Sequence, residues 1–349
     1  MRITRTSFAG LAIAALLLGA CSTDTADDAA IADDTADDQA AGDSAEATGA
    51  SYDPNADPPD GWERRDPVLP PAPEGELHEI EIRATNVDAH VGGGVVQQLW
   101  GFDDQVPGPT LRAKVGDTFR VTFVNDADMS HSIDFHASKV DPATEMRTIP
   151  PGESLVYEFE AKHAGIFIYH CGTAPVLLHT GNGQYGAVVI DPPDLPEVDH
   201  EYVLVQSEFY LGADGEIGDM TKMQDDAWDI VAFNGFADQY AHAPITDVEP
   251  GERVRVWLLN AGPSENSSFH VIGTIFDTVY KEGAYRLHPD MGLDGGAQAL
   301  DLQPSQGGFV EFTFDTDGFY PFVTHKFSNV GKGALGVFLV GDADADAGH

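Results

Sequence analysis

Residues 165–184 read Gly-Ile-Phe-Ile-Tyr-His-Cys-Gly-Thr-Ala-Pro-Val-Leu-Leu-His-Thr-Gly-Asn-Gly-Gln, an apolar, strand-like run followed by a loop that carries a thiol and two imidazoles. Cys171 and His179 share this loop, and His131 follows another strand and turn some forty residues upstream. One thiolate and two imidazoles from two loops suit a trigonal copper site with a weak axial ligand. We therefore expect His131, Cys171 and His179 to bind an electron-transfer copper.

The sequence around this segment alternates short apolar strands with Gly, Pro, Asn and Asp, which is typical of an all-β sandwich or barrel. Strand-like runs at 119–124, 154–159 and 186–190 are examples. The pattern then repeats: 115–125 resembles 250–260, 150–159 resembles 303–312, and 165–170 resembles 318–325. Two copies of one β fold are therefore predicted, with a hinge near Pro192 and Pro193.

Three further histidines are placed as though for a second metal. His136 lies five residues after His131, and His170 directly precedes Cys171. Neighbouring residues of a strand point to opposite faces, so His170 and Cys171 can serve two different metals. His325 occupies the His170 position of the second repeat. Three imidazoles with an open position would make a catalytic copper or zinc site.

The charge balance excludes some classes of partner. The 349 residues contain 58 acidic and 18 basic side chains, a formal charge of −40. Such a surface repels nucleic acid and anionic lipid, so neither is expected as a partner. A small anionic substrate would need a locally positive site, such as a metal.

The N-terminus has the features of an export signal. Two arginines precede a short apolar run that ends Leu-Gly-Ala-Cys21, which resembles a bacterial lipobox. We expect 1–21 to be a lipoprotein signal with Cys21 lipidated, which places the protein outside the cell membrane, either on a lipid anchor or periplasmic. We expect an acidic disordered linker over 22–75 and an acidic tail over 342–349. The two β domains would then span 76–193 and 198–341.

These motifs resemble those of the copper-containing nitrite reductases over residues 76–341. That family has a His-x-x-Asp-x-His segment and a His-Cys pair in its first domain, here His131 to His136 and His170-Cys171. The resemblance implies two tandem cupredoxin-like Greek-key β-barrels in a homotrimer. It also implies reduction of nitrite to nitric oxide, with electrons from a small cupredoxin or c-type cytochrome.

The resemblance also implies a role for individual residues, with one type 1 and one type 2 copper in each subunit. Type 1 copper would be bound by His131, Cys171 and His179, with Gln184 at the axial position where the family usually has Met. Type 2 copper would be bound by His136, His170 and His325, the last from the neighbouring subunit. The catalytic residues would be Asp134 and His270, with Ile272 capping the substrate pocket.

Two alternatives lead to different functions. A two-domain multicopper oxidase needs paired His-x-His motifs for its trinuclear cluster, whereas this chain has none and Cys171 is followed by Gly172. A copper-binding electron-transfer lipoprotein without turnover would use the Cys171 site alone. Gln184, a harder ligand than Met, keeps this second alternative open. For the axial position itself, the alternative to Gln184 is a site with no axial side chain.

Overall fold

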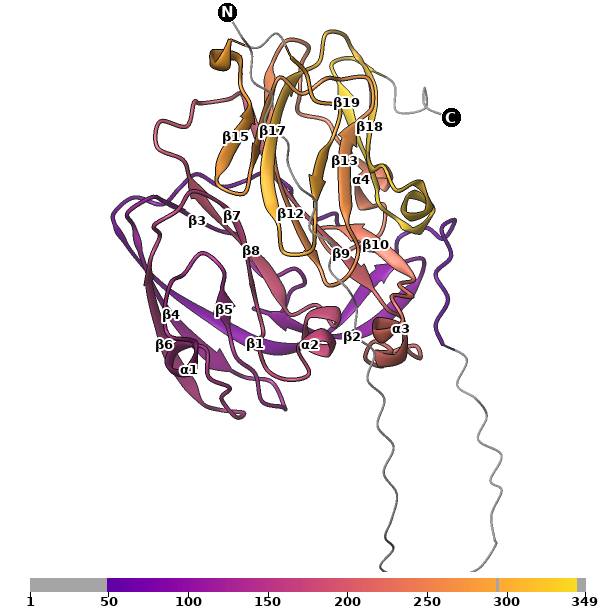
Figure 1. Cartoon of the computed structure of the whole chain (residues 1–349). Helices are drawn as coiled ribbons and strands as arrows, with labels where there is room; N and C mark the ends of the chain where they lie inside the picture. The colour runs from indigo at the N-terminus through magenta and orange to yellow at the C-terminus, as the bar shows by residue number, and fades with distance from the viewer. Residues whose placement is uncertain (1–48, 293–294, 344–349) are drawn as a thin grey trace, which may run out of the picture. The chain divides into compact units, whose positions relative to one another are not determined.

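The computed structural model describes residues 49–292 and 295–343, and the signal segment with Cys21 lies outside this range. The first domain consists of two four-stranded sheets (Figure 1). One has the order β2-β1-β4-β6 and is built from Val95–Phe102, Leu77–Gly92, Thr118–Asn125 and Ser154–Glu160. The other has the order β3-β8-β7-β5 and is built from Leu111–Lys114, Tyr185–Asp191, Gly165–His170 and Asp134–Phe135. Two short helices lie between strands, α1 (Pro142–Glu145) and α2 (Val176–Gly181).

The second domain repeats this plan with extra strands. Its first sheet has the order β10-β9-β12-β17-β14-β15, built from Ile230–Phe233, His200–Phe209, Arg253–Gly262, Gly307–Thr313, Thr278–Lys281 and Ala284–Leu287. Its second has the order β11-β19-β18-β13-β16, built from Ala243–Ile245, Leu335–Val340, Gly318–Thr324, Ser267–Val271 and Leu300–Leu302. The remaining elements are α3 (Met220–Gln224), α4 (Gln239–His242), η1 (Pro289–Met291) and η2 (Phe327–Lys332).

The two domains share one strand topology. β1 runs parallel to β4 and β4 antiparallel to β6, just as β9 runs parallel to β12 and β12 antiparallel to β17. The second sheets correspond in the same way, with β3-β8-β7-β5 matching β11-β19-β18-β13. The all-β fold of two tandem domains and the repeat predicted from the sequence are therefore confirmed.

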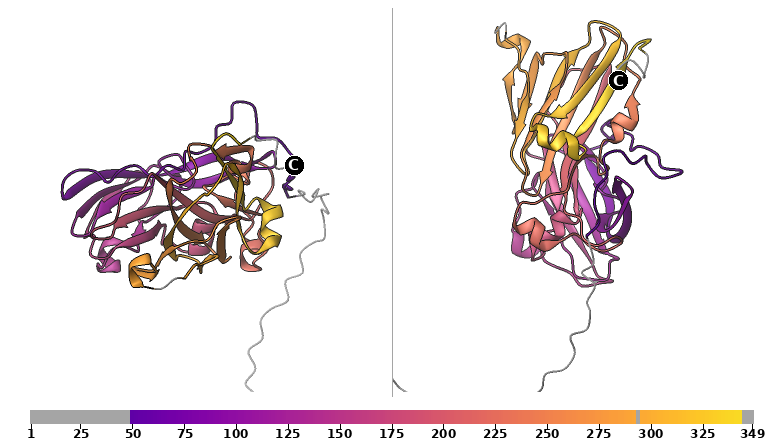
Figure 2. Two further views of the ribbon diagram at one scale, coloured as in Figure 1. Left: turned by 90° about the horizontal axis from the view of Figure 1, so that it is seen from above. Right: turned by 90° about the vertical axis from the view of Figure 1, so that its right-hand side faces the viewer.

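The strand β7 is buried on both faces, which explains its continuous apolar sequence. Tyr169 points into the core between the two sheets of the first domain, while Ile166 and Ile168 pack against Trp257 and Phe309 of the second domain. The right-hand view of Figure 2 shows the orange and yellow strands of the second domain above the indigo and magenta strands of the first. The metal-ligand loop after β7 thus starts from a strand fixed by both domains.

Residues 49–75 differ from the expectation of a disordered linker. They form almost no regular secondary structure, yet they pack along both domains. Leu69 is buried in the interdomain core, its N–H donates to the Glu201 carbonyl at 2.9 Å, and Trp62 packs on Phe236 with ring centroids 4.8 Å apart. A few apolar side chains and backbone hydrogen bonds are enough to order the segment because the domains supply the complementary surface. The rest of the expected linker, 22–48, lies outside the described residues.

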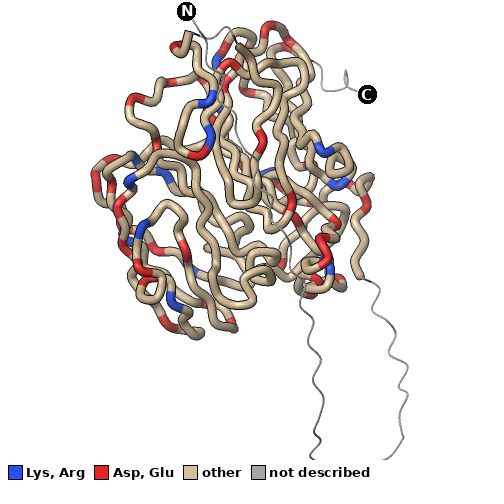
Figure 3. Tube along the Cα trace, viewed as in Figure 1, with Lys and Arg blue, Asp and Glu red and all other residues tan. Residues whose placement is uncertain are grey.

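Acidic positions outnumber basic ones and are distributed over both domains (Figure 3). None of the helices in the described parts of the chain has the length and hydropathy that a membrane span requires. The expected acidic tail, 342–349, is described only as far as residue 343.

Candidate metal centre

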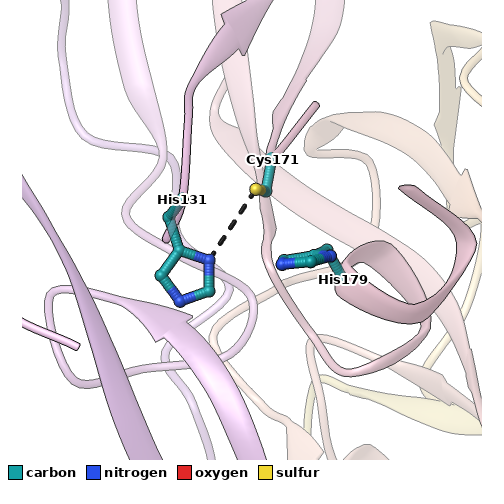
Figure 4. Close-up of side chains that lie close together, drawn as sticks. All are labelled: His131, Cys171 and His179. Carbon is teal, nitrogen blue, oxygen red and sulfur yellow. Dashed lines mark hydrogen bonds between the residues drawn. The ribbon is translucent and has the colours of Figure 1, made fainter. Parts of the chain in front are cut away.

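Cys171, His131 and His179 meet in a buried cluster of the first domain (Figure 4). Cys171 follows β7 directly, His131 lies just before β5, and His179 belongs to α2. The Sγ atom of Cys171 is 3.8 Å from Nδ1 of His131, and one ligand atom of each residue lies within 4.8 Å of the others. The fold thus brings together the three residues that the sequence analysis selected.

Backbone hydrogen bonds hold the sulfur of Cys171. The N–H groups of Ser132 and Thr173 each donate to Sγ at 3.4 Å, from the two sides of the cluster. These two hydrogen bonds fix the position of the sulfur, the atom through which a cysteine binds metal. The backbone N–H of Cys171 donates to the backbone carbonyl of Gln184 at 3.1 Å, and this hydrogen bond joins the two ends of the ligand loop.

The cluster contains several buried polar atoms that lack a hydrogen-bond partner among the described residues. These are Nε2 of His131, Nε2 of His179 and both amide atoms of Gln184. The His131 nitrogen that faces the Cys171 sulfur is Nδ1. Buried polar atoms are nearly always paired, so the unpaired Nε2 of His179 and the unpaired amide of Gln184 fit a bound ion. Burial, together with the neighbouring His179, lowers the pKa of His131 to about 4, which keeps the imidazole neutral and able to bind metal. Thiolate with imidazole is a donor set for copper or zinc.

Trp100, in β2, packs against this cluster and was not selected by the sequence analysis. Its ring centroid lies 4.7 Å from that of His179 and 5.8 Å from that of His131, and its backbone N–H donates to the Asn182 carbonyl at 2.9 Å. The indole therefore covers both imidazoles, and the backbone hydrogen bond ties β2 to the ligand loop. No local pattern marks Trp100, because it lies on a strand remote in sequence from the loop that it contacts.

A second cluster contains Asp134, His136 and His170. The pairing of β5 with β7 sets Asp134 opposite His170. The Nε2 atoms of His136 and His170 are 3.0 Å apart, and a carboxylate oxygen of Asp134 is 3.9 Å from each. Burial and the neighbouring His170 lower the pKa of His136, which leaves a neutral ligand. A separation of about 3 Å suits two nitrogens on one ion with bonds of about 2 Å.

His170 and Cys171 contribute to different clusters although they are neighbours in the chain. The His170 ring pairs with His136, whereas the Cys171 sulfur turns toward His131. In addition, Nδ1 of His170 lies 2.9 Å from the carbonyl oxygen of Cys171, which makes Nδ1 the donor and leaves Nε2 free to bind metal.

The second domain presents its own pair of imidazoles, His270 and His325, with ring centroids 5.2 Å apart. They line a cavity of about 240 Å³ with Ser268, Gln298 and Ala299. The Nδ1 atom of His270 donates to the Gln298 carbonyl. Ile272 follows β13 directly and is 42% exposed. The candidate metal clusters formed by the described residues of one chain include neither His270 nor His325.

Comparisons with known proteins agree with this architecture. A family model described as multicopper oxidase matches residues 83–195. The copper-containing nitrite reductase of Neisseria gonorrhoeae is 35% identical over 291 residues, which cover 80% of this chain and 73% of that protein. The chain belongs to the copper-containing nitrite reductase family. The enzyme of that name from Cereibacter sphaeroides is 27% identical over 300 residues, covering 77% of this chain and 78% of its own.

Solved structures of copper nitrite reductases match most of this chain. The copper nitrite reductase from Nitrosomonas europaea matches with a TM-score of 0.69 and 35% identity, covering 78% of this chain and 97% of that one. The copper nitrite reductase from Thermus scotoductus matches with a TM-score of 0.69 and 31% identity, over 77% of this chain and 63% of its own. The family resemblance drawn from the sequence is therefore confirmed, in preference to the two alternatives.

Proposed function

We propose that this copper nitrite reductase catalyses the one-electron reduction of nitrite to nitric oxide, consuming two protons and releasing water. The observation that carries the proposal is the pair of ligand clusters built on adjacent residues, one around Cys171 and one around His170. The family membership of the chain supports the same reaction.

In this proposal His131, Cys171, His179 and Gln184 hold type 1 copper, and His136 and His170 hold type 2 copper together with His325 of a neighbouring subunit. When bound, the first copper takes up and releases one electron, and the second binds nitrite as a Lewis acid. The peptide between His170 and Cys171 joins the two ligand sets through covalent bonds. This peptide also keeps the distance between the two ligand sets constant, because β7 packs against both domains.

Asp134 and His270 would supply the protons. The Asp134 carboxylate lies beside both Nε2 atoms of the His136–His170 pair, where it can hold a proton next to a bound anion. Nδ1 of His270 must carry hydrogen, because its partner is a carbonyl oxygen that can only accept. Proton transfer by His270 would therefore use Nε2, the ring atom that is free to face the substrate. Ile272 would cap the pocket.

The proposal includes a homotrimer, as the family resemblance implies, and it requires a neighbouring subunit because one chain does not place His325 with His136 and His170. The surface around His325 supports an interface at this position, because the exposed Phe327 ring lies 4.6 Å from the His325 ring. Large exposed apolar residues around a polar site are typical of an interaction surface.

The electron would come from a small donor protein, a cupredoxin or a c-type cytochrome. The exposed Val176, three residues before His179 in α2, supports a docking surface at the type 1 site. The protein would be exported, held by a lipid on Cys21 at the outer face of the cell membrane or free in the periplasm.

A metal count combined with a nitrite assay tests the proposal. We expect two coppers per chain, a visible thiolate–copper absorption band, and nitric oxide from nitrite with an artificial electron donor. His136→Ala should abolish turnover and leave the band. Loss of the band together with turnover in this variant would show that the division of ligands is wrong. Saturation of the wild-type protein with one copper per chain would contradict the reductase and leave an electron carrier.

A further inference from the structure

Arg65, in the segment that precedes the first domain, is bonded to both domains. Its guanidinium donates to the carbonyl oxygens of Pro107 and Gly108, the latter at 3.1 Å. The backbone N–H of Arg65 donates to the side-chain oxygen of Gln239 at 2.8 Å, and its backbone carbonyl accepts from the Tyr240 hydroxyl at 3.1 Å. One residue therefore ties a first-domain loop to the second domain.

The loop that Arg65 holds, residues 106–109, packs directly under the Cys171 ligand loop. Gly108 donates its N–H to the Tyr185 carbonyl at 2.8 Å, and Pro109 accepts from the Tyr169 hydroxyl at 2.7 Å. Tyr185 follows Gln184, and Tyr169 lies two residues before Cys171. Both ends of the ligand loop are thus bonded to residues 108–109.

A third contact leaves the ligand loop little freedom to move. Gly183 has a φ of +101°, and a Cβ atom there would approach the methyl carbons of Val106 to 2.8 Å. The backbone of the loop at Gly183 therefore rests on Val106. A shift of residues 106–109 would be transmitted to Gly183 and hence to the adjoining Gln184.

The chemistry of an arginine suits this position. The guanidinium presents donors in a rigid fork, which can satisfy two successive carbonyls at once, whereas a lysine ammonium is a single point. Burial lowers the pKa of Arg65, against the neighbouring phenols of Tyr169, Tyr240 and Tyr185, which raise it. Hydrogen bonds in such a desolvated place are stronger than on the surface. Removing the guanidinium would leave the carbonyl oxygens of Pro107 and Gly108 without this donor, which is costly for buried groups.

We propose that Arg65 is a positioning residue for the metal site at Cys171, acting through residues 106–109 on the loop that carries His179 and Gln184. The inference deepens the proposed function and rests on it, since it assumes that the Cys171 cluster holds type 1 copper. It also gives the segment 49–75 a role in the metal site.

The test uses the full chain loaded with Cu(II), and it measures the thiolate–copper absorption band and the rate of copper loss to excess chelator. Arg65→Met should shift the band and release copper about tenfold faster, as expected for the loss of an outer-shell partner of metal ligands. Arg65→Lys keeps the charge without the fork and should fall between Arg65→Met and the wild type. If Arg65→Met does not fold, the band and the copper-release rate of Arg65→Lys, compared with those of the wild type, test the inference.

Tyr52→Phe is the matched control. Tyr52 belongs to the same segment, but its hydroxyl donates to Asp238 of the second domain, at 3.3 Å, and to no other residue that the structure describes. This variant should keep the wild-type band and release rate. The inference would be overturned by Arg65 variants with a wild-type band and rate, or by Tyr52→Phe releasing copper as fast as Arg65→Met. A wild-type protein without the band would instead overturn the proposed function, and the inference with it.

Discussion

In the first domain Cys171 follows His170, whereas in the second domain Lys326 follows His325. The strand register makes these positions equivalent: β5 pairs with β7, and β13 with β18, so that His136 corresponds to His270 and His170 to His325. The ring centroids of the two pairs are also similarly spaced, at 5.0 Å and 5.2 Å. The framework therefore presents an imidazole pair twice.

What differs is the space beside each pair. In the first domain it holds the sulfur of Cys171 with two imidazoles and orphaned polar atoms. In the second domain the Lys326 ammonium is bonded to the buried carboxylate of Glu265 and lies 4.6 Å from the centre of the Trp228 ring. The position that carries the Cys171 ligand in the first domain is therefore occupied by the Lys326–Glu265 ion pair in the second. The strands thus fix where a site can form, and a few loop side chains decide whether it binds metal.

The largest expected effect comes from removing the thiol. Cys171→Ser should eliminate the absorption band, lower the copper content to one per chain and reduce nitrite turnover by on the order of 100-fold or more. Lys326→Met, at the equivalent position of the second domain, should keep both the band and the copper content. Absorption spectra with a metal count check this, and loss of the band in Lys326→Met would break the comparison.

Asp134→Asn should give the next largest effect. The amide cannot deliver a proton, so turnover should fall by about 100-fold, within the range of general acid–base catalysis. Both coppers and the band should remain, since Asp134 is not among the proposed ligands. Asp126→Asn, which alters an exposed ion pair with Arg83, serves as the control and should turn over nitrite at the wild-type rate. Equal rates for the two variants would remove Asp134 from the mechanism.

Lys326→Met should lower the free energy of unfolding by about 1–3 kcal/mol, because it leaves the buried Glu265 carboxylate without its cation. Adding Glu265→Gln should recover part of this loss, which a double-mutant cycle in urea would measure. Lys162→Met removes an ion pair with Glu160 in which both side chains are half exposed, and should cost less than about 1 kcal/mol. Similar losses in the two lysine variants would mean that the Glu265 pair is no more than a surface contact.

The smallest effect is expected from Gln184→Met, which tests the axial position. A softer thioether should favour Cu(I) relative to the amide, and so raise the reduction potential of the Cys171 site without changing the copper content. A redox titration followed at the absorption band measures the change. An unaltered potential would indicate a site without an axial side chain.

The sequence by itself determined the strands, the repeat and the choice of His131, His136, His170, Cys171 and His179 as candidate ligands. These features are local: alternation along a strand, a Gly-rich turn, or the spacing between a thiol and the next imidazole. Cys171, His179 and Gln184 share one loop, so their proximity follows from the chain itself. The family resemblance carried by the same motifs was also readable without a structure.

Only the tertiary structure decided how these residues are supported. Trp100 covers two imidazoles, Arg65 holds the loop beneath the thiol, and Glu265 reaches Lys326 across 61 positions of the chain. Residues 49–75 are acidic and poor in apolar groups, a composition that predicts disorder, yet they are ordered on a surface made by both domains. The composition of a segment shows how much apolar surface it can bury by itself. The tertiary fold decides whether other segments provide a surface against which it can pack.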